Sequence, residues 1–216
     1  MRHPKRLLFL DIDGVLNSFA WEREYHAKFG HIPSEWTNEM IAEVQLDPKA
    51  VQRLNCFCRS AGCQVVISSM WRTHFDLATI SKLLRGHGFK GRIISQTPKL
   101  SILEMDPEPT GVPLRMSTYS HPLFDKQRSL EIETWICHNY SLEERHKLHI
   151  CIVDDMAEMG RLSSWFIQTK EATGWLDEHS EKLALCLQQP LGNTLDTPSP
   201  LLREGAAKRM TPECCL

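Results

Sequence analysis

The chain has 216 residues, of which 42% are hydrophobic, and its formal net charge is −2 at neutral pH. This length allows one core of ordinary size, and the near-neutral charge excludes a strong overall basic field that would hold polyanions without sequence preference. Eight cysteines do not indicate a disulfide framework, which is typical of small secreted chains. The apolar run after the basic N-terminus is too short for a signal peptide or a membrane span, so we expect a cytoplasmic protein without membrane contact.

The hydrophobic pattern predicts strands that alternate with helices. Residues 7–10 are continuously apolar, which is typical of a central parallel strand covered on both faces. Further strands are predicted at residues 65–67, 92–94, 149–153 and 165–167, and helical periodicity predicts helices at residues 48–61, 75–84, 129–140 and 177–188. This alternation indicates an α/β domain with a parallel sheet of about five strands and right-handed crossovers.

Three stretches do not follow the alternation. Residues 17–47 come directly after the first strand and are too few for a cap with its own core, so we expect a small helical flap. Residues 96–126 contain five prolines and are expected to form a long irregular connection. Residues 189–216 show little periodicity. We therefore expect one domain over residues 1–188 and a disordered tail after it.

Two carboxylates follow the first predicted strand. Asp11 and Asp13 lie in the sequence Asp-Ile-Asp-Gly, which places them at the carboxyl edge of the sheet, where open α/β folds bind ligands. Since a strand alternates faces, both side chains point the same way, and Gly14 lets the chain turn off the sheet. Paired carboxylates repel unless a cation lies between them. Mg²⁺ prefers such oxygen ligands and also binds phosphate oxygens, so the pair predicts a magnesium site.

Polar residues also end two later predicted strands. Ser68 and Ser69 end the second strand, where a hydroxyl and backbone N–H groups are suited to hold a phosphoryl oxygen. Asp154 and Asp155 end the fourth strand at the same edge. Solubility alone does not explain three acidic or hydroxyl strand ends at one sheet edge.

In this order, the motifs resemble those of the haloacid dehalogenase (HAD) superfamily over most of residues 6–170. The segments DIDGVL, ISSMWR, RSLEIETWI and VDD are similar to the HAD domain of Swiss Army knife RNA repair proteins. The resemblance implies a Rossmann-like core with a minimal cap and Mg²⁺-dependent phosphatase activity. It identifies Asp11 as the nucleophile and Asp13 as the acid and base, and it assigns phosphate binding to Ser68.

The resemblance also implies the metal ligands and a basic residue at the phosphate. The Asp11 carboxylate, the Asp13 backbone carbonyl and the Asp154 carboxylate would hold Mg²⁺, and Asp155 would support them directly or through water. The family often uses lysine as the basic residue. Here Arg128 is assigned to this role, with Lys126 and Lys99 as rivals and a solvated or helix-pairing charge as the other interpretation of Arg128.

Arg72 and several aromatic residues have two interpretations each. Arg72 either lines the substrate entrance, where it would meet a second phosphate or a carboxylate, or forms an internal salt bridge to an acidic strand end. Aromatic side chains either offer stacking faces for bases or pack the flap onto the core; they are Trp21, Tyr25, Trp36 and Trp71.

The sequence therefore predicts a phosphatase that forms an aspartyl-phosphate and acts on an unidentified phosphomonoester. Because no large cap is expected, the site should be open and favour a phosphate on a large, even macromolecular, substrate. One alternative is a phosphatase that processes nucleic-acid ends, although the net charge does not indicate nucleic acid. Another is a catalytically silent HAD domain that serves as a binding module, which the presence of both Asp11 and Asp13 argues against.

Overall fold

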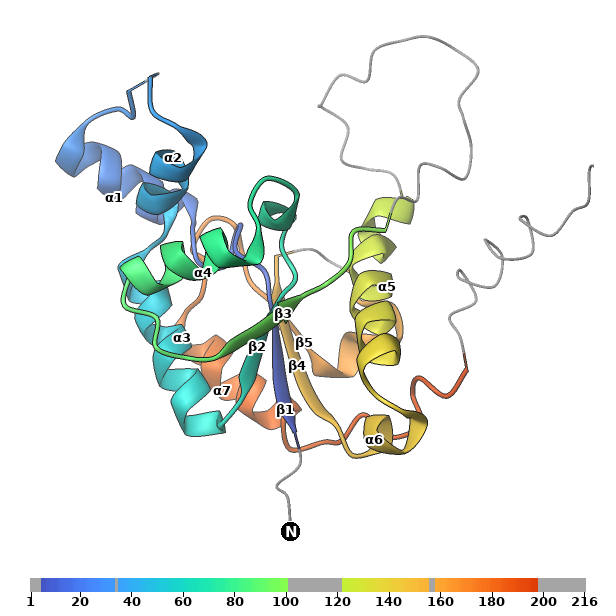
Figure 1. Cartoon of the computed structure of the whole chain (residues 1–216). Coiled ribbons are helices and arrows are strands. Elements are labelled where there is room, and N and C mark those ends of the chain that lie inside the picture. The colour runs from blue at the N-terminus through green and yellow to red at the C-terminus, as the bar shows by residue number, and fades with distance from the viewer. Residues whose placement is uncertain (1–4, 34, 101–121, 156–157, 198–216) are drawn as a thin grey trace, which may run out of the picture.

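The computed structural model describes residues 5–33, 35–100, 122–155 and 158–197. Five parallel strands form one sheet in the order β3-β2-β1-β4-β5 (Figure 1). The strands are β1 (Arg6–Leu10), β2 (Gln64–Ile67), β3 (Ile93–Gln96), β4 (His149–Asp154) and β5 (Phe166–Gln168). The central strand β1 is buried from its second residue onward. The parallel α/β sheet predicted from the apolar runs is therefore confirmed.

Helices cover both faces of the sheet (Figure 1). One face carries α3 (Pro48–Ala61), α4 (Leu77–Gly86) and α7 (Asp177–Cys186). The other carries α5 (Pro122–Asn139) and the 3-10 helix η3 (Gly160–Trp165), and the short helix α6 (Leu142–His146) follows α5. None of the helices in the described residues is long and apolar enough to cross a membrane.

Local capping explains where the helices of the first face begin. The Asp47 side chain accepts a hydrogen bond from the Lys49 N–H (2.8 Å), and proline stands at the first position of α3. The Asp76 side chain caps α4 in the same way by accepting from the Thr79 N–H (2.7 Å). Helix α4 therefore starts at Leu77, two residues later than predicted, because the residues after β2 first form the 3-10 helix η1 (Met70–Thr73).

Helix α5 is longer than predicted. It begins at Pro122 rather than at residue 129, since proline fits the first turn of a helix, where its missing N–H is not needed. Arg128 therefore lies well inside the helix and not at its start. The irregular connection expected at residues 96–126 ends in helix from residue 122 onward, and residues 101–121 lie outside the described part of the chain.

The insert after β1 contains two helices, α1 (Phe19–Phe29) and α2 (Asn38–Gln45), above the carboxyl edge of the sheet (Figure 1). Helix α1 contains no buried residue, and Ala42 is the only buried residue of α2. The Trp21 indole donates a hydrogen bond to the Val44 carbonyl (2.9 Å) and so joins the two helices. The described part of the insert therefore has little hydrophobic core of its own.

The prediction of a disordered tail is wrong for residues 189–197, which pack on the domain. Pro190 forms an isolated bridge with His149, and the Leu191 N–H donates to the Leu148 carbonyl (2.7 Å). Leu191 and Leu195 are both buried. Two leucines four residues apart in a short polar stretch give too little periodicity for sequence reasoning to detect. Residues 198–216 lie outside the described residues.

Candidate active site

Asp11 is the first residue after β1 and is buried (3% exposed). Its backbone N–H donates to the Val153 carbonyl (3.0 Å), so the parallel pairing with β4 continues to this position. Its carboxylate accepts a hydrogen bond from the Ile12 N–H (2.7 Å). Burial raises the pKa of Asp11, and the nearby Arg128 guanidinium partly offsets that rise.

Asp13 is half-buried and is held by two donors from different parts of the chain. The Trp71 indole N–H (2.9 Å) and the Asn17 side-chain amide (2.8 Å) both donate to its Oδ1 atom. The Asn17 side-chain oxygen in turn accepts from the Gly14 N–H (2.8 Å). These bonds fix the orientation of the Asp13 carboxylate.

Gly14 brings the turn after β1 against the end of β4. Its φ of 62° is in the left-handed region, which favours glycine. A Cβ atom at this position would clash with the side chain of Asp155. The glycine therefore allows Asp155 to lie next to the Asp11–Asp13 turn.

Three carboxylates meet at this sheet edge. Asp11, Asp154 and Asp155 each offer an oxygen atom, and these atoms lie within 4.8 Å of one another. Burial and the neighbouring Asp11 charge raise the pKa of Asp155 to about 6. The Asp13 side chain is not part of this group. A set of oxygen donors at this spacing fits a hard divalent cation.

The end of β2 contributes two buried serines. The Ser68 N–H donates to the Leu10 carbonyl (2.8 Å), which continues the pairing of β2 with β1. The Ser68 hydroxyl is buried and has no hydrogen-bond partner among the described residues. Ser69 bonds to the Asp11 carboxylate and also caps η1, where its hydroxyl accepts from the Trp71 N–H (3.3 Å). A buried hydroxyl without a protein partner is typical of a site where a ligand oxygen completes the hydrogen bond.

Arg128 is the basic residue that the structure brings to these carboxylates. Its Nε atom lies 3.0 Å from Asp154 Oδ2, and its Nη2 atom lies 3.6 Å from Asp11 Oδ2. The Arg128 side chain is 8% exposed, so it is not a solvated surface charge. Lys99 is exposed, and the side chain of Lys126 lies outside the described residues.

Arg72 does not line an entrance but forms an internal ion pair. It pairs with Glu131 of α5, and both side chains are 2% exposed. The interpretation as an internal salt bridge is therefore correct, although its partner lies on a helix and not at a strand end. Trp71 is buried and bonded to Asp13, so it offers no free stacking face. Trp21 is half-buried, and its indole N–H is bonded within the insert.

Sequence reasoning missed two residues of this site. Asn17 lies four positions after Asp13 and was assigned to the insert, whereas its side chain closes the turn after β1. Glu131 lies three positions after Arg128, a spacing that places the two side chains on one helix face. That spacing was a usable signal for Glu131.

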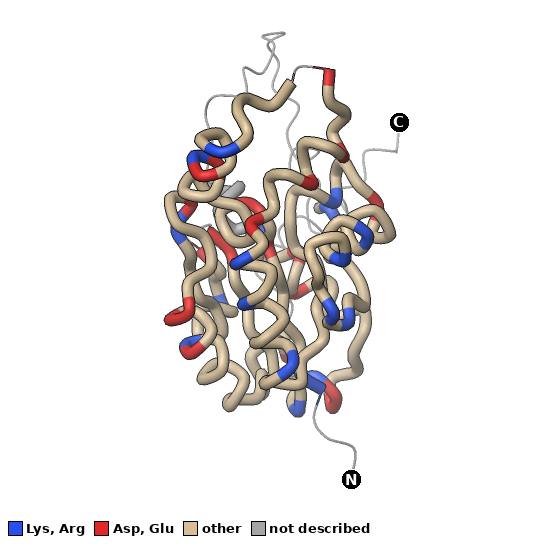
Figure 2. Tube along the Cα trace, turned by 90° about the vertical axis from the view of Figure 1, so that its left-hand side faces the viewer, with Lys and Arg blue, Asp and Glu red and all other residues tan. Residues whose placement is uncertain are grey.

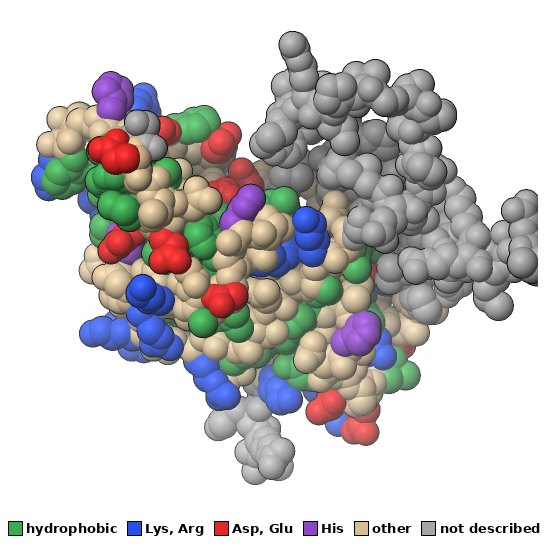
Figure 3. Space-filling view, turned by 45° about the horizontal axis from the view of Figure 1, so that its top comes forward, with side chains coloured by type: hydrophobic (Ala, Val, Ile, Leu, Met, Phe, Trp, Pro, Cys, Tyr) green, Lys and Arg blue, Asp and Glu red, His purple; other side chains and the backbone are tan. Residues whose placement is uncertain are grey.

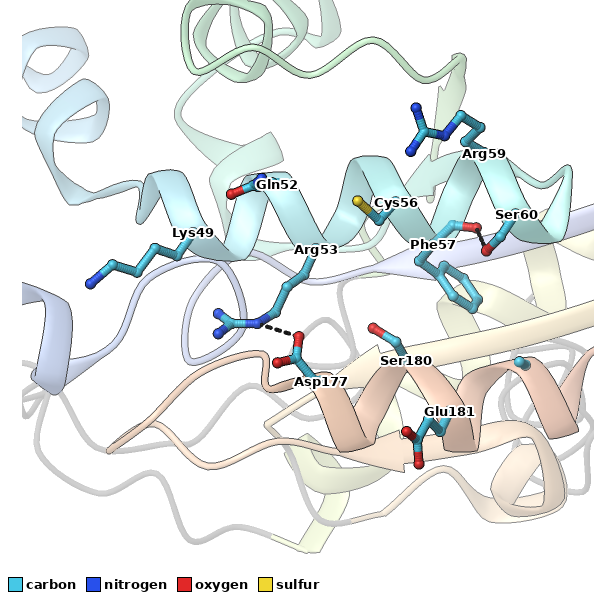
Figure 4. A pocket seen from close by; sticks show the side chains of 11 residues that line it. Lys49, Gln52, Arg53, Cys56, Phe57, Arg59, Ser60, Asp177, Ser180 and Glu181 are labelled. Atoms are coloured by element: carbon cyan, nitrogen blue, oxygen red, sulfur yellow. Dashed lines mark hydrogen bonds and ion pairs between the residues drawn. The ribbon is translucent and has the colours of Figure 1, made fainter.

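Acidic side chains are visible beside the insert when the carboxyl edge is turned towards the viewer (Figure 3). A separate groove of about 820 Å³ lies between α3 and α7 (Figure 4). It is lined by charged and polar residues such as Lys49, Arg53 and Glu181, and Arg53 is paired with Asp177 across it (2.9 Å). None of the carboxylates described above lines this groove, so it is not the candidate active site.

Comparison with known proteins identifies the family. The model of a family described as the HAD domain in Swiss Army Knife RNA repair proteins matches residues 7–180. A search of curated proteins and a search of solved structures gave no match. The matched range runs from β1 into α7 and includes every site residue described above. The chain therefore belongs to this family of HAD domains.

Proposed function

We propose that the protein is a Mg²⁺-dependent phosphatase that hydrolyses a phosphomonoester through an aspartyl-phosphate on Asp11. The proposal rests mainly on one observation. A buried carboxylate at the end of β1 lies beside the carboxylates of Asp154 and Asp155 and within reach of the Arg128 guanidinium. Membership of the HAD domain family supports this reading.

The reaction needs a nucleophile and a proton carrier, and the chain offers one carboxylate for each. A carboxylate oxygen of Asp11 attacks phosphorus, and the bond from phosphorus to the leaving oxygen breaks. Asp13 donates a proton to the leaving oxygen. Water then attacks the aspartyl-phosphate and gives its proton to Asp13, which releases inorganic phosphate and restores Asp11.

The residues present fit a magnesium ion. The side-chain donors are all carboxylate oxygens, which Mg²⁺ prefers, and the raised pKa values of Asp11 and Asp155 reflect burial and carboxylates crowded together. Asp11 and Asp154 would hold the ion with the Asp13 backbone carbonyl, and Asp155 would support them. When bound, the ion offsets the charge on these carboxylates and on the phosphate.

Two further side chains are proposed to bind the phosphoryl group. Ser68 has a buried hydroxyl without a partner among the described residues, which a phosphate oxygen would satisfy. Arg128 carries a fixed positive charge next to the nucleophile and can share its N–H donors with phosphate oxygens. We propose both as phosphate-binding residues.

The test is phosphate release from an aryl phosphate with and without Mg²⁺. Asp11→Asn should abolish turnover, since it removes the nucleophile and preserves the shape. Asp13→Asn should keep the affinity for Mg²⁺ and lose about 10²–10⁴-fold in rate, the usual contribution of a general acid and base. Asp177→Asn, an exposed acid at the start of α7, is the matched control. Activity of Asp11→Asn at the wild-type rate would refute the mechanism.

A second candidate function is the removal of phosphate from nucleic-acid ends. The family takes its description from RNA repair proteins, and the insert beside the site has little core with which to enclose a small substrate. On the side of the molecule that Figure 2 shows, helices α3 and α4 carry basic residues and no acidic one; they are Lys49, Arg53, Arg59, Lys82 and Arg85. Acidic residues of this side lie on α7, which begins with Asp177 and Glu178.

A further inference from the structure

A chain of alternating charges extends from the nucleophile into helix α5 and η1. Glu131 pairs with Arg72 through its Oε2 atom, and the same oxygen lies 3.6 Å from the Nη1 atom of Arg128. Arg128 continues the chain to Asp11 and Asp154. These side chains are all at most 8% exposed, so water screens their charges little. Glu131 is the anion between two buried arginines.

Two guanidinium groups at this spacing need an anion between them. Burial lowers the pKa of Arg72, Glu131 raises it again, and the positive charge of Arg128 lowers it further. The two arginines therefore repel each other, and a buried charge without a partner is costly. Without the Glu131 charge, Arg72 would lose its carboxylate partner. Arg128 would then be repelled by the positive charge of Arg72.

The Glu131 carboxylate is itself held firmly. Its Oε1 atom accepts hydrogen bonds from the Leu100 backbone N–H and from the Gln127 side-chain amide, both at 3.2 Å. Arg72 is fixed as well, since it also donates to the Ser69 carbonyl at the end of β2. The position of Arg128 is thus tied to α5, to the segment after β3 and to the end of β2.

We propose that Glu131 is a positioning residue for phosphoryl transfer: it holds the Arg128 guanidinium against Asp11 and Asp154, and Arg72 secures Glu131 from the other side. Glu131 touches neither the nucleophile nor the phosphate and acts only through Arg128. The proposal rests on the proposed phosphatase function, because Arg128 matters there as the cation beside Asp11.

The matched pair of variants is Glu131→Gln and Glu133→Gln. Both glutamates are buried on α5, and each pairs with an arginine, but the partner of Glu133 is Arg161 (2.5 Å), which has no contact with Asp11. Each substitution removes one buried carboxylate charge and preserves the side-chain shape. A general loss of structure affects both variants, whereas loss of Arg128 positioning affects Glu131→Gln alone.

The kinetic readout is kcat for Mg²⁺-dependent hydrolysis of an aryl phosphate. Glu131→Gln should lower kcat by about 10–100-fold, the usual effect of losing a partner that orients an active-site group, and Glu133→Gln should leave it near the wild-type rate. In an Arg128→Ala background, Glu131→Gln should have almost no further effect, whereas independent sites would multiply their effects. An equal loss in both backgrounds would overturn the positioning role.

A second readout does not depend on activity. In the wild type and in Glu133→Gln, the Nε–H proton of Arg128 should exchange slowly with solvent in nuclear magnetic resonance spectra, because Nε is buried at 3.0 Å from Asp154. In Glu131→Gln it should exchange faster. Unchanged exchange would overturn the inference. A wild type that releases no phosphate would refute the proposed function, and the exchange rates would still decide the role of Glu131.

Discussion

Single residues decide how closely the strand ends approach one another in this site. Gly14 shows this most directly, because this position requires both a left-handed φ and the absence of a Cβ atom. The same left-handed φ occurs at Gly62, where a Cβ atom would meet nothing within 4 Å. A comparison of substitutions at Gly14 and Gly62 therefore separates the cost of backbone strain from the cost of displacing Asp155.

Gly14→Ala should cost more than Gly62→Ala in both stability and activity. Either substitution costs roughly 1–2 kcal/mol for a left-handed backbone. Only Gly14→Ala also displaces Asp155, so only this variant should lose phosphatase activity and the rise in melting temperature on addition of Mg²⁺. The measurements are thermal unfolding with and without Mg²⁺ and phosphate release. Equal behaviour of the two variants would show that Asp155 tolerates the methyl group.

His179 makes stability depend on pH. It is buried in the first turn of α7, where its Nδ1 atom accepts a hydrogen bond from the Leu176 N–H (2.9 Å). Burial lowers the pKa of His179 below the usual 6.5. The Glu178 charge raises this pKa, whereas the nearby Lys182 and Arg53 charges lower it. The neutral imidazole is the form that fits, so the folded state binds its proton less tightly than the unfolded state does.

The stability contributed by His179 should therefore be complete above pH 6.5 and decline as the pH falls below that value. His179→Asn keeps an acceptor near the Nδ1 position and does not titrate. Between about pH 8 and about pH 5, urea unfolding should show a smaller loss of stability in this variant than in the wild type. Equal losses in the two proteins would contradict the assignment. The comparison cancels the opposite trend of Asp155, whose raised pKa removes stability as pH rises.

At the scale of elements, much of the fold could be predicted from periodicity. Continuous apolar runs identified all five strands, and the strand ends led to Asp11, Ser68 and Asp154, because parallel strands bring their carboxyl ends to one edge. Helix starts were less accurate, since α4 and α5 begin at a cap and at a proline rather than at the first apolar residue. Hydrogen-bond partners such as Asn17 depend on turn geometry, which periodicity does not contain.

The segment at residues 189–197 was the clearest error, and its removal is the corresponding test. Ending the chain after Gln189 should lower the free energy of unfolding, because a buried leucine contributes about 1.5–3 kcal/mol and both Leu191 and Leu195 are lost. The Arg161 side chain would also lose its hydrogen bonds to the Thr194 (3.2 Å) and Thr197 (2.8 Å) carbonyls.

Ending the chain after Thr197 is the control for this truncation, because it keeps all of these contacts. Urea unfolding of the two truncated proteins and the full chain measures the difference. The chain ending after Gln189 should be the least stable of the three. If its stability equals that of the full chain, the docked segment does not contribute.

For the whole molecule, the question is which substrate the carboxyl edge of the sheet admits. The described part of the insert buries one residue of its two helices, so it does not form a lid with a core. Exclusion of water during the reaction would then depend on the substrate, which favours a phosphate on an extended molecule. We expect kcat/KM for an oligoribonucleotide with a terminal phosphate to exceed that for a sugar phosphate by about tenfold or more, about 1.4 kcal/mol of transition-state binding.

Steady-state phosphate release on both substrates at equal Mg²⁺ measures this preference. The same oligoribonucleotide without its terminal phosphate serves as a competitor, and it should inhibit if the strand itself is bound. A higher kcat/KM for the sugar phosphate would refute the open-site reading and leave the phosphatase mechanism intact.

The strand order also determines when the site can form during synthesis. Strand β1 lies between β2 and β4, and β4 comes from the second half of the chain. Until residues 149–154 leave the ribosome, one edge of β1 has no partner, and an unpaired apolar strand edge can pair with other chains. Arg128 and Asp154 are likewise absent while Asp11 is already made. Asp11, the proposed nucleophile, therefore remains without its cationic and acidic neighbours until most of the domain has been synthesised, so the candidate active site is among the last features of the fold to form.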